Sequence, residues 1–446
     1  MKKTILLFTL IICGSSIYFS SCKSKKDQLP ALLETQKSMG TAEEKAMISS
    51  TYNKAIEALK KNPDDLQQYI NLASVYISEG RLTGNNNYYS NAAMLVLNKV
   101  TGSNTGNKDI VFQALSLKSA VLLNMHQFKA AMEAAQQGVG LNSYNSGIFG
   151  ALVDANVELG NYDDAVKDCD KMISIRPDLR SYSRASYLRQ IYGQNAGAID
   201  AMKMAVAAGM PGSENTEWAR THLGDLYLNT GNIDSAYILY KSSLVFLPKY
   251  PYALIGLARV EEAKKNYDAA IAYTDTAIQV VSEAAFVSFL GDLYELKGDV
   301  AKAKEVRNDV VDLLEQGQKD ESSDALVKHN VSREMAIAYM NAGNLDKALQ
   351  YAQTDINMRP ENIDANDLIA WVYYLKGDFA NAKIHADKML ATKTQNANTL
   401  YKAGLIYAAA GDTGKGNALM QNAVAINQYI DQRIIKEAKP MVALNK

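Results

Sequence analysis

The sequence predicts an all-α solenoid, in which antiparallel helix pairs stack into a superhelix of roughly ten repeats. Three observations support this fold class: a stretch with two amphipathic helices, small residues that return at a nearly constant interval, and an aliphatic position that returns with them. No segment shows the two-residue period of a strand. One helix pair cannot bury its apolar face alone, so each repeat is expected to lean on its neighbours and to spread stability along the array.

The clearest pair of helices lies in Glu217–Pro248. In its first half, Leu223, Leu226 and Tyr227 recur at i, i+3 and i+4, which places them on one helix face. Gly231 follows as a residue that can take the left-handed conformation ending a helix. The second half is again amphipathic, and the proline that closes the stretch stops the second helix.

Small residues form a ladder along the chain. Its steps are 33 or 34 residues, apart from one of 38 and one of 45. Its members are Ala131, Ala165, Ala198, Ala236, Ala270, Ala303, Ala348, Ala382 and Gly416. The residue eight positions after each member is always aliphatic. A larger side chain at the ladder position would push crossing helices apart, because overpacking costs about 1–3 kcal/mol.

This pattern resembles the tetratricopeptide repeat (TPR), a 34-residue helix–turn–helix unit. The residues that carry the resemblance are Gly224, Tyr227, Gly231, Ala236, Tyr240 and Pro248. The turn motif Gly160–Ala165 recurs in similar form along the array. The resemblance implies a right-handed superhelix whose concave groove is lined by the first helix of each pair.

The N-terminus predicts a lipoprotein signal peptide over residues 1–21. Lys2 and Lys3 precede an apolar run that is too short for a transmembrane helix. Phe19-Ser20-Ser21-Cys22 resembles a bacterial lipobox, although Phe and Ser replace the usual Leu and small residue. The resemblance implies acylation of Cys22 and a lipid-anchored protein of a Gram-negative cell envelope. The alternative is an ordinary secretory signal, with Cys22 a free thiol.

The rest of the chain divides into a polar tether over 22–40, an N-terminal part of the array over 41–315, an insertion over 316–328 and a C-terminal part over 329–446. A first helix pair is expected at about Thr41–Asn62. The insertion accounts for the 45-residue step and is the expected place for a bend. Asp431–Ala438 resembles a capping helix, which shields the last apolar face of a solenoid.

Charge and chemistry favour binding over catalysis. The net charge is −1 and becomes −3 once Lys2 and Lys3 leave, so neither nucleic acid nor a membrane surface finds a basic patch. His126, His222, His329 and His385 are far apart in the sequence, and no metal, phosphate-loop or nucleophile motif occurs. We therefore expect no enzyme activity, no cofactor and no metal. Cys169, at a core position, is expected to be a buried and inert thiol.

Positions that face the groove in TPR proteins are occupied here by aromatic and charged residues, the types that dominate contact energy at interfaces. The candidates for partner binding are Arg180, Arg184, Tyr187, Trp218, Asp225, Tyr252, Arg259, Trp371 and Tyr374. The alternative for each is packing against a neighbouring helix.

The sequence thus predicts a scaffold that binds a protein or peptide and is attached through lipid at Cys22. We expect it to face the periplasm, with the outer membrane as the expected membrane. The alternative function is a subunit of an outer-membrane assembly or export complex, an analogy that rests on architecture alone.

Overall fold

The computed structural model describes residues 29–34, 38–321 and 325–444. It divides the chain into Met1–Leu33 and an array over Glu34–Lys446, and the array is the subject here. The predicted signal peptide at 1–21, the lipidation site Cys22 and much of the predicted tether lie outside the described residues.

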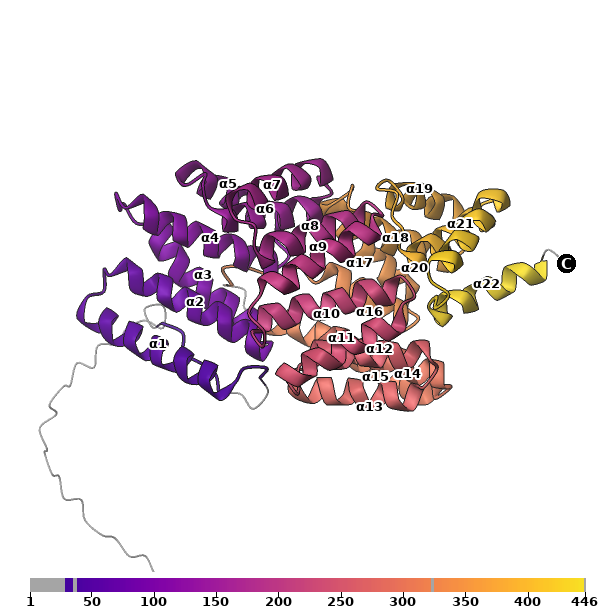
Figure 1. Ribbon diagram of the computed structural model, residues 1–446, viewed down its shortest axis with the longest axis horizontal. Helices are drawn as coiled ribbons and strands as arrows, with labels where there is room; N and C mark the ends of the chain where they lie inside the picture. The colour runs from indigo at the N-terminus through magenta and orange to yellow at the C-terminus, as the bar shows by residue number, and fades with distance from the viewer. Residues whose placement is uncertain (1–28, 35–37, 322–324, 445–446) are drawn as a thin grey trace, which may run out of the picture. The chain divides into compact units, whose positions relative to one another are not determined.

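In its described residues the array consists of α-helices, with no strand. Ten pairs of antiparallel helices lie between a single α1 (Ala42–Lys61) and a single α22 (Gln432–Leu444) (Figure 1). The first helices of the pairs are α2 (Leu66–Thr83), α4 (Lys108–Asn124), α6 (Ser146–Leu159), α8 (Leu179–Ile191), α10 (Glu214–Asn229), α12 (Pro251–Ala263), α14 (Ala284–Lys297), α16 (Ser332–Asn341), α18 (Ile363–Leu375) and α20 (Ala397–Ala409). The second helices are α3 (Asn86–Thr101), α5 (Phe128–Leu141), α7 (Tyr162–Ile175), α9 (Asn195–Ala208), α11 (Ile233–Phe246), α13 (Tyr267–Val280), α15 (Val300–Asp320), α17 (Leu345–Met358), α19 (Phe379–Met389) and α21 (Thr413–Ile426).

The small residues lie where the two helices of a pair cross. A Cβ atom added to Gly404 would lie 2.8 Å from the carbonyl oxygen of Gly416. One added to Gly224 would lie 2.6 Å from the ring of Tyr240. Every alanine of the ladder is buried, from Ala131 to Ala382. The predicted all-α TPR solenoid is confirmed, because its equivalent positions are occupied in the same way pair after pair.

The prediction of a first helix pair at about Thr41–Asn62 is wrong. That stretch is the one continuous helix α1. Its start is fixed by a capping box, in which Thr41 and Glu44 accept each other's backbone N–H groups. Neither glycine nor proline follows before Asn62, so nothing breaks the helix into two.

The two long steps of the ladder have different structures. In the 38-residue step, the extra residues form a short loop between Ala208 and Glu214. In the 45-residue step, α15 continues for 21 residues, seven more than α13 or α17, before an irregular segment leads to Ser332.

We had expected each repeat to lean on its neighbours in the sequence. Some repeats also contact repeats far away in the sequence. Four successive within-pair turns meet an inter-pair loop about 200 residues further along the chain, roughly one superhelical turn of a TPR array. The turn after α4 meets the loop before α16, where Asn330 N–H donates to the carbonyl of Met125 (3.1 Å). The turn after α10 meets the loop after α21, where the Asn427 amide donates to the carbonyl of Leu228 (3.1 Å). The superhelix is therefore wound tightly enough for its turns to touch.

The contact between α6 and the loop before α18 holds the most polar groups. The guanidinium of Arg359, 3% exposed, forms ion pairs with Asp355 on its own helix and with Glu158 on α6. The buried Asn362 amide donates to the carbonyls of Val157 and Glu158, at 3.2 and 3.1 Å. The Tyr162 hydroxyl accepts the Ile363 N–H at 2.8 Å. We call the side chains that make these contacts the inter-turn clasp: Glu158, Tyr162, Asp355, Arg359 and Asn362.

Glycine is required in two of the turns that make these contacts. Gly160 has φ +83°, and a Cβ atom there would lie 2.5 Å from the carbonyl carbon of Glu361. Gly193 has φ +68°, and its Cβ would lie 2.5 Å from the carbonyl oxygen of Lys393. Both the left-handed backbone and the close approach of the next superhelical turn exclude a side chain.

Within the described residues, none of the helices is both long enough and apolar enough to cross a membrane.

Replacing Arg359 by alanine should destabilise the array by about 3–5 kcal/mol, because Glu158 and Asp355 lose their buried counter-charge. Urea denaturation followed by circular dichroism measures this. Lys167→Ala is the matched control, since Lys167 pairs with Asp164 on an exposed surface and should leave the midpoint unchanged. Equal midpoints for the two variants would contradict a role for the clasp.

Candidate functional site

Two adjoining cavities lie on the inner face of the array, and the first helices of the pairs provide most of their walls. The large cavity, about 1340 Å³, is lined mainly by α2, α4, α6, α8, α10 and α12. The small cavity, about 960 Å³, is lined mainly by α12, α14, α16, α18, α20 and the start of α22. Asn229 and Arg259 line both. Cavities of this size and mixed polarity are typical of binding sites.

Most residues proposed from the sequence for partner binding meet in the large cavity. They are Arg180, Arg184, Tyr187, Trp218, Asp225, Tyr252 and Arg259. Trp371 lines the small cavity instead. Tyr374 lines neither: it is 7% exposed, stacks on Trp371 and donates its hydroxyl to the carbonyl of Glu437 (3.3 Å).

The carboxylates of the large cavity are paired with arginines. The Arg184 Nε donates to Asp154 at 2.8 Å and to the carbonyl of Gly150 at 3.1 Å. Arg81 binds Glu214 at 2.8 Å, and Arg359 of the inter-turn clasp binds Glu158. Asp225 accepts the Tyr240 hydroxyl at 2.7 Å, with Arg259 at 3.5 Å. Four negative charges are thus matched, and these arginines belong to the wall.

Other polar groups of the large cavity lack partners among the described residues. They include the guanidinium of Arg180, the hydroxyl of Tyr187 and the indole N–H of Trp218. The side-chain amides without a hydrogen-bond partner in this same part of the chain are Gln113, Asn124, Gln190, Asn215 and Asn229. Sequence reasoning missed these amides. Their signal was a polar residue on the inner face of a first helix, which we read only for aromatic and charged types.

The aromatic groups of the large cavity are held in place. The rings of Trp218 and His222 are 3.8 Å apart between centroids, and His222 Nδ1 lies 3.0 Å from the carbonyl of Trp218. The Tyr252 hydroxyl donates to Glu283 at 2.7 Å. Fixed aromatic faces bind with a smaller entropy cost than mobile ones.

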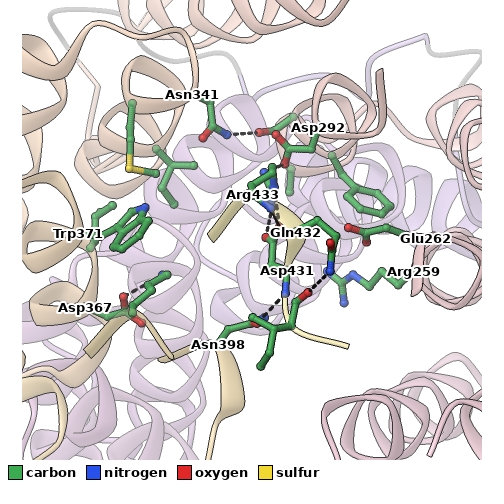
Figure 2. Close-up of a pocket in the computed structure, with 18 of the residues that line it drawn as sticks. Arg259, Glu262, Asp292, Asn341, Asp367, Trp371, Asn398, Asp431, Gln432 and Arg433 are labelled. Atoms are coloured by element: carbon green, nitrogen blue, oxygen red, sulfur yellow. Dashed lines mark hydrogen bonds and ion pairs between the residues drawn. The ribbon is translucent and has the colours of Figure 1, made fainter. Parts of the chain in front are cut away.

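The small cavity is dominated by charge. Figure 2 shows Arg433 pointing at Asp292, beside Asp431 and opposite Trp371 and Asp367. Arg433 forms ion pairs with Asp292 and Asp431, and Arg307 binds Asp292 at 3.1 Å. Burial works to raise the pKa of Asp431, yet the Arg433 guanidinium holds it below its usual range. Glu262 has no such partner among the described residues. Burial first and then Asp431 raise its pKa to about 7, against the opposing charge of Arg433.

The inter-turn contact also brings together two histidines that are 203 residues apart in sequence. The rings of His126 and His329 lie 4.8 Å apart, and His126 Nδ1 is 3.7 Å from Glu334. Sequence spacing could not reveal this pair. Burial lowers the pKa of His329 to about 4, with His126 adding to the effect. Across the described part of the chain, no group of three or more His, Cys, Asp or Glu side chains could hold a metal ion.

Cys169, expected to be an inert thiol, is 3% exposed. Burial raises its pKa to about 11, with Asp170 adding to the effect. A thiol with this pKa is rarely a nucleophile at neutral pH.

Comparison with known proteins finds only distant likenesses to solved structures. No family model and no curated protein matches the chain. Solved structures with similar arrangements include a tetratricopeptide repeat protein from Parabacteroides merdae, with 19% identity, a TM-score of 0.34, and 58% of this chain and 98% of that one covered. Pseudomonas aeruginosa pilF has 15% identity and a TM-score of 0.38, and the match covers 46% of this chain and 93% of that one. The human IFIT1 dimer with PPP-AAAA has 14% identity and a TM-score of 0.44, and the match covers 85% of this chain and 87% of that one. These TM-scores are low, and the likenesses carry no argument about function.

The Glu262 carboxylate should make stability depend on pH. The folded chain binds this proton more tightly than the unfolded chain, so ionisation destabilises the fold as the pH rises from 4.5 to about 7. Glu262→Gln should therefore stabilise the protein at pH 8, by about 1–2 kcal/mol after screening, and should lose this gain below pH 4.5.

Urea denaturation at pH 4 and pH 8 measures the effect. The matched exchange at the exposed Glu57 should give no gain that disappears on acidification. A gain for Glu262→Gln of the same size at both pH values would show that the charge is not its cause.

Proposed function

We propose that the protein is a non-catalytic scaffold that holds an extended segment of a partner protein in the large cavity. The observation that carries the proposal is the row of unpaired side-chain amides on α4, α8 and α10 (Gln113 to Asn229), beside fixed aromatic rings. An amide both donates and accepts, so it can bind the backbone of an extended chain whatever its sequence. Leaving such groups exposed to the cavity costs nothing while water fills it, and they are ready to exchange that water for a ligand.

Arg180 gives the site a preference for charge. The other arginines of the large cavity bind carboxylates of its own wall, whereas no described residue pairs with the Arg180 guanidinium. An acidic side chain of the partner would bind there, close to Tyr187, which lies two turns along α8. Trp218 on the next first helix would take an apolar neighbour, since a partly exposed indole gains most from being covered.

Catalysis finds less support in the two cavities. The carboxylates of the large cavity are explained by ion pairs, and the raised pKa of Glu262 is explained by burial near Asp431.

We also propose attachment to the envelope through lipid at Cys22, with the array facing the periplasm. The support is the order of charge, apolar run, small residues and cysteine in residues 1–22. The polar tether predicted from the sequence would let a lipid-anchored array reach a partner away from the membrane surface.

Photocrosslinking in intact cells tests partner binding. A photoreactive amino acid at position 218 should give a discrete adduct, and Arg180→Glu in the same chain should reduce its yield about tenfold. The control position is Ile238, 63% exposed on α11 and away from both cavities. An equal adduct from position 238, or no adduct from position 218, would contradict binding in the large cavity.

Replacing Cys22 by alanine should abolish acyl labelling and shift the protein from the membrane to the soluble fraction, because the attachment point of the lipid is lost. Cys169→Ala controls for loss of any cysteine and should fractionate as the unchanged protein does. If the Cys22 variant stays in the membrane fraction with its label, the anchoring proposal is wrong.

A further inference from the structure

α22 follows the last pair, where the first helix of another pair would stand, but it packs differently from the first helices. Each first helix from α4 to α20 packs along the second helix before it, whereas α22 packs against α20 and does not run along α21. The outer surface of α21 stays exposed, with Val424 at 48%. A helix that only capped the array would cover this surface. α22 turns instead into the inner face.

The first turn of α22 crosses the small cavity. The Arg433 guanidinium binds Asp292 on α14, which precedes α22 by four pairs in chain order (Figure 2). One turn further along, the Lys436 Nζ lies 3.5 Å from Glu295 on the same helix. Two basic residues at the start of α22 thus face two acidic residues of α14.

The neighbouring side of α22 is apolar. Ile434 is 5% exposed and packs against Trp371, Tyr374 and Ile406 of α18 and α20. The Tyr374 hydroxyl donates to the carbonyl of Glu437. The face that docks therefore combines arginine, isoleucine and lysine within one helical turn, and the receiving face combines two acids with an aromatic shelf.

Without α22, the receiving face would be acidic. Arg307 would remain the cation in ion-pair contact with Asp292 and Glu295, and Glu262 already lacks a partner in the described part of the chain. The Lys436–Glu295 pair is open to solvent, with side chains 46% and 30% exposed, and contributes little. The Arg433–Asp292 pair and the Ile434 contact are more buried, so a displacing helix has to replace the same charge and the same apolar contact. Attachment of α22 to the same chain adds to these contacts by raising its effective concentration.

We propose that the inner face of α14, α18 and α20 is a docking site for a basic amphipathic helix of a partner protein, and that α22 occupies this site until the partner displaces it. The partner helix carries an arginine, an adjacent aliphatic residue and a lysine three positions after the arginine. This site is separate from the large cavity and does not depend on binding there.

A peptide that copies residues 431–446 is the probe, labelled with a fluorophore and followed by anisotropy. The full-length chain should bind it weakly, because α22 fills the site. In the release variant Arg433→Glu/Lys436→Glu, α22 is repelled from Asp292 and Glu295, and the affinity for the peptide should rise at least tenfold. Adding Asp292→Asn to the release variant should lower it again about tenfold, and higher salt should weaken binding.

Two controls isolate the site. Lys60→Glu/Lys203→Glu reverses the same number of charges on exposed helices and should leave peptide binding at the full-length level. A peptide in which the residues equivalent to Arg433 and Lys436 are replaced by glutamate should not bind the release variant. Arg180→Glu, in the large cavity, should have no effect on peptide binding. The proposal for α22 can therefore fail while the function proposed above holds, and that function can fail while this proposal holds.

Three results would overturn the proposal. A folded release variant that does not bind the peptide would show that the face is not a receptor. Equal peptide affinity for the full-length chain and the release variant would show that α22 does not occupy it. Global loss of helicity in both the release variant and the milder Arg433→Gln/Lys436→Gln would show that α22 is a structural cap.

Discussion

The contact between successive superhelical turns sets the geometry of everything inside the array. At Gly160 the backbone of one turn approaches that of Glu361 so closely that no Cβ fits between them. Beside it, Arg359 places a buried charge between Asp355 and Glu158. In a solenoid without such contacts the superhelical pitch can change, because each repeat contacts only its neighbours. Here the pitch is fixed, and buried groups that need each other's charge resist its opening.

A fixed pitch turns the inner face into two cavities of different character. In the large cavity, ion pairs fix the charged groups of the wall and leave amides, aromatic rings and Arg180 available. In the small cavity, acidic residues face the basic start of α22. The first is suited to an extended chain and the second to a helix. Under the two proposals above, one array would hold two segments of its partners, by backbone hydrogen bonds in one place and by charge in the other.

Much of the fold followed from the sequence because helix pairing depends on residues close together in the chain. Small residues such as Gly224 and the ladder residue Ala236 act across one turn. The single helix α1 was mispredicted as a pair because the local pattern of its second half resembles a second TPR helix. The groove residues on α8, α10 and α12 were predictable, since the inner face of a first helix follows from its phase. Tyr374 was not, because α22 covers it.

The sequence by itself determined the fold class, the spacing of the helix pairs from Ala131 onward and the absence of recognisable catalytic motifs, because all three depend on local spacing. Tertiary structure alone decided the rest: that Glu158 meets Arg359, that His126 meets His329, and that Arg433 reaches Asp292. These residues are between 141 and 203 positions apart. Their meeting depends on the accumulated rotation of several helix pairs, to which each pair contributes a small angle that no motif encodes.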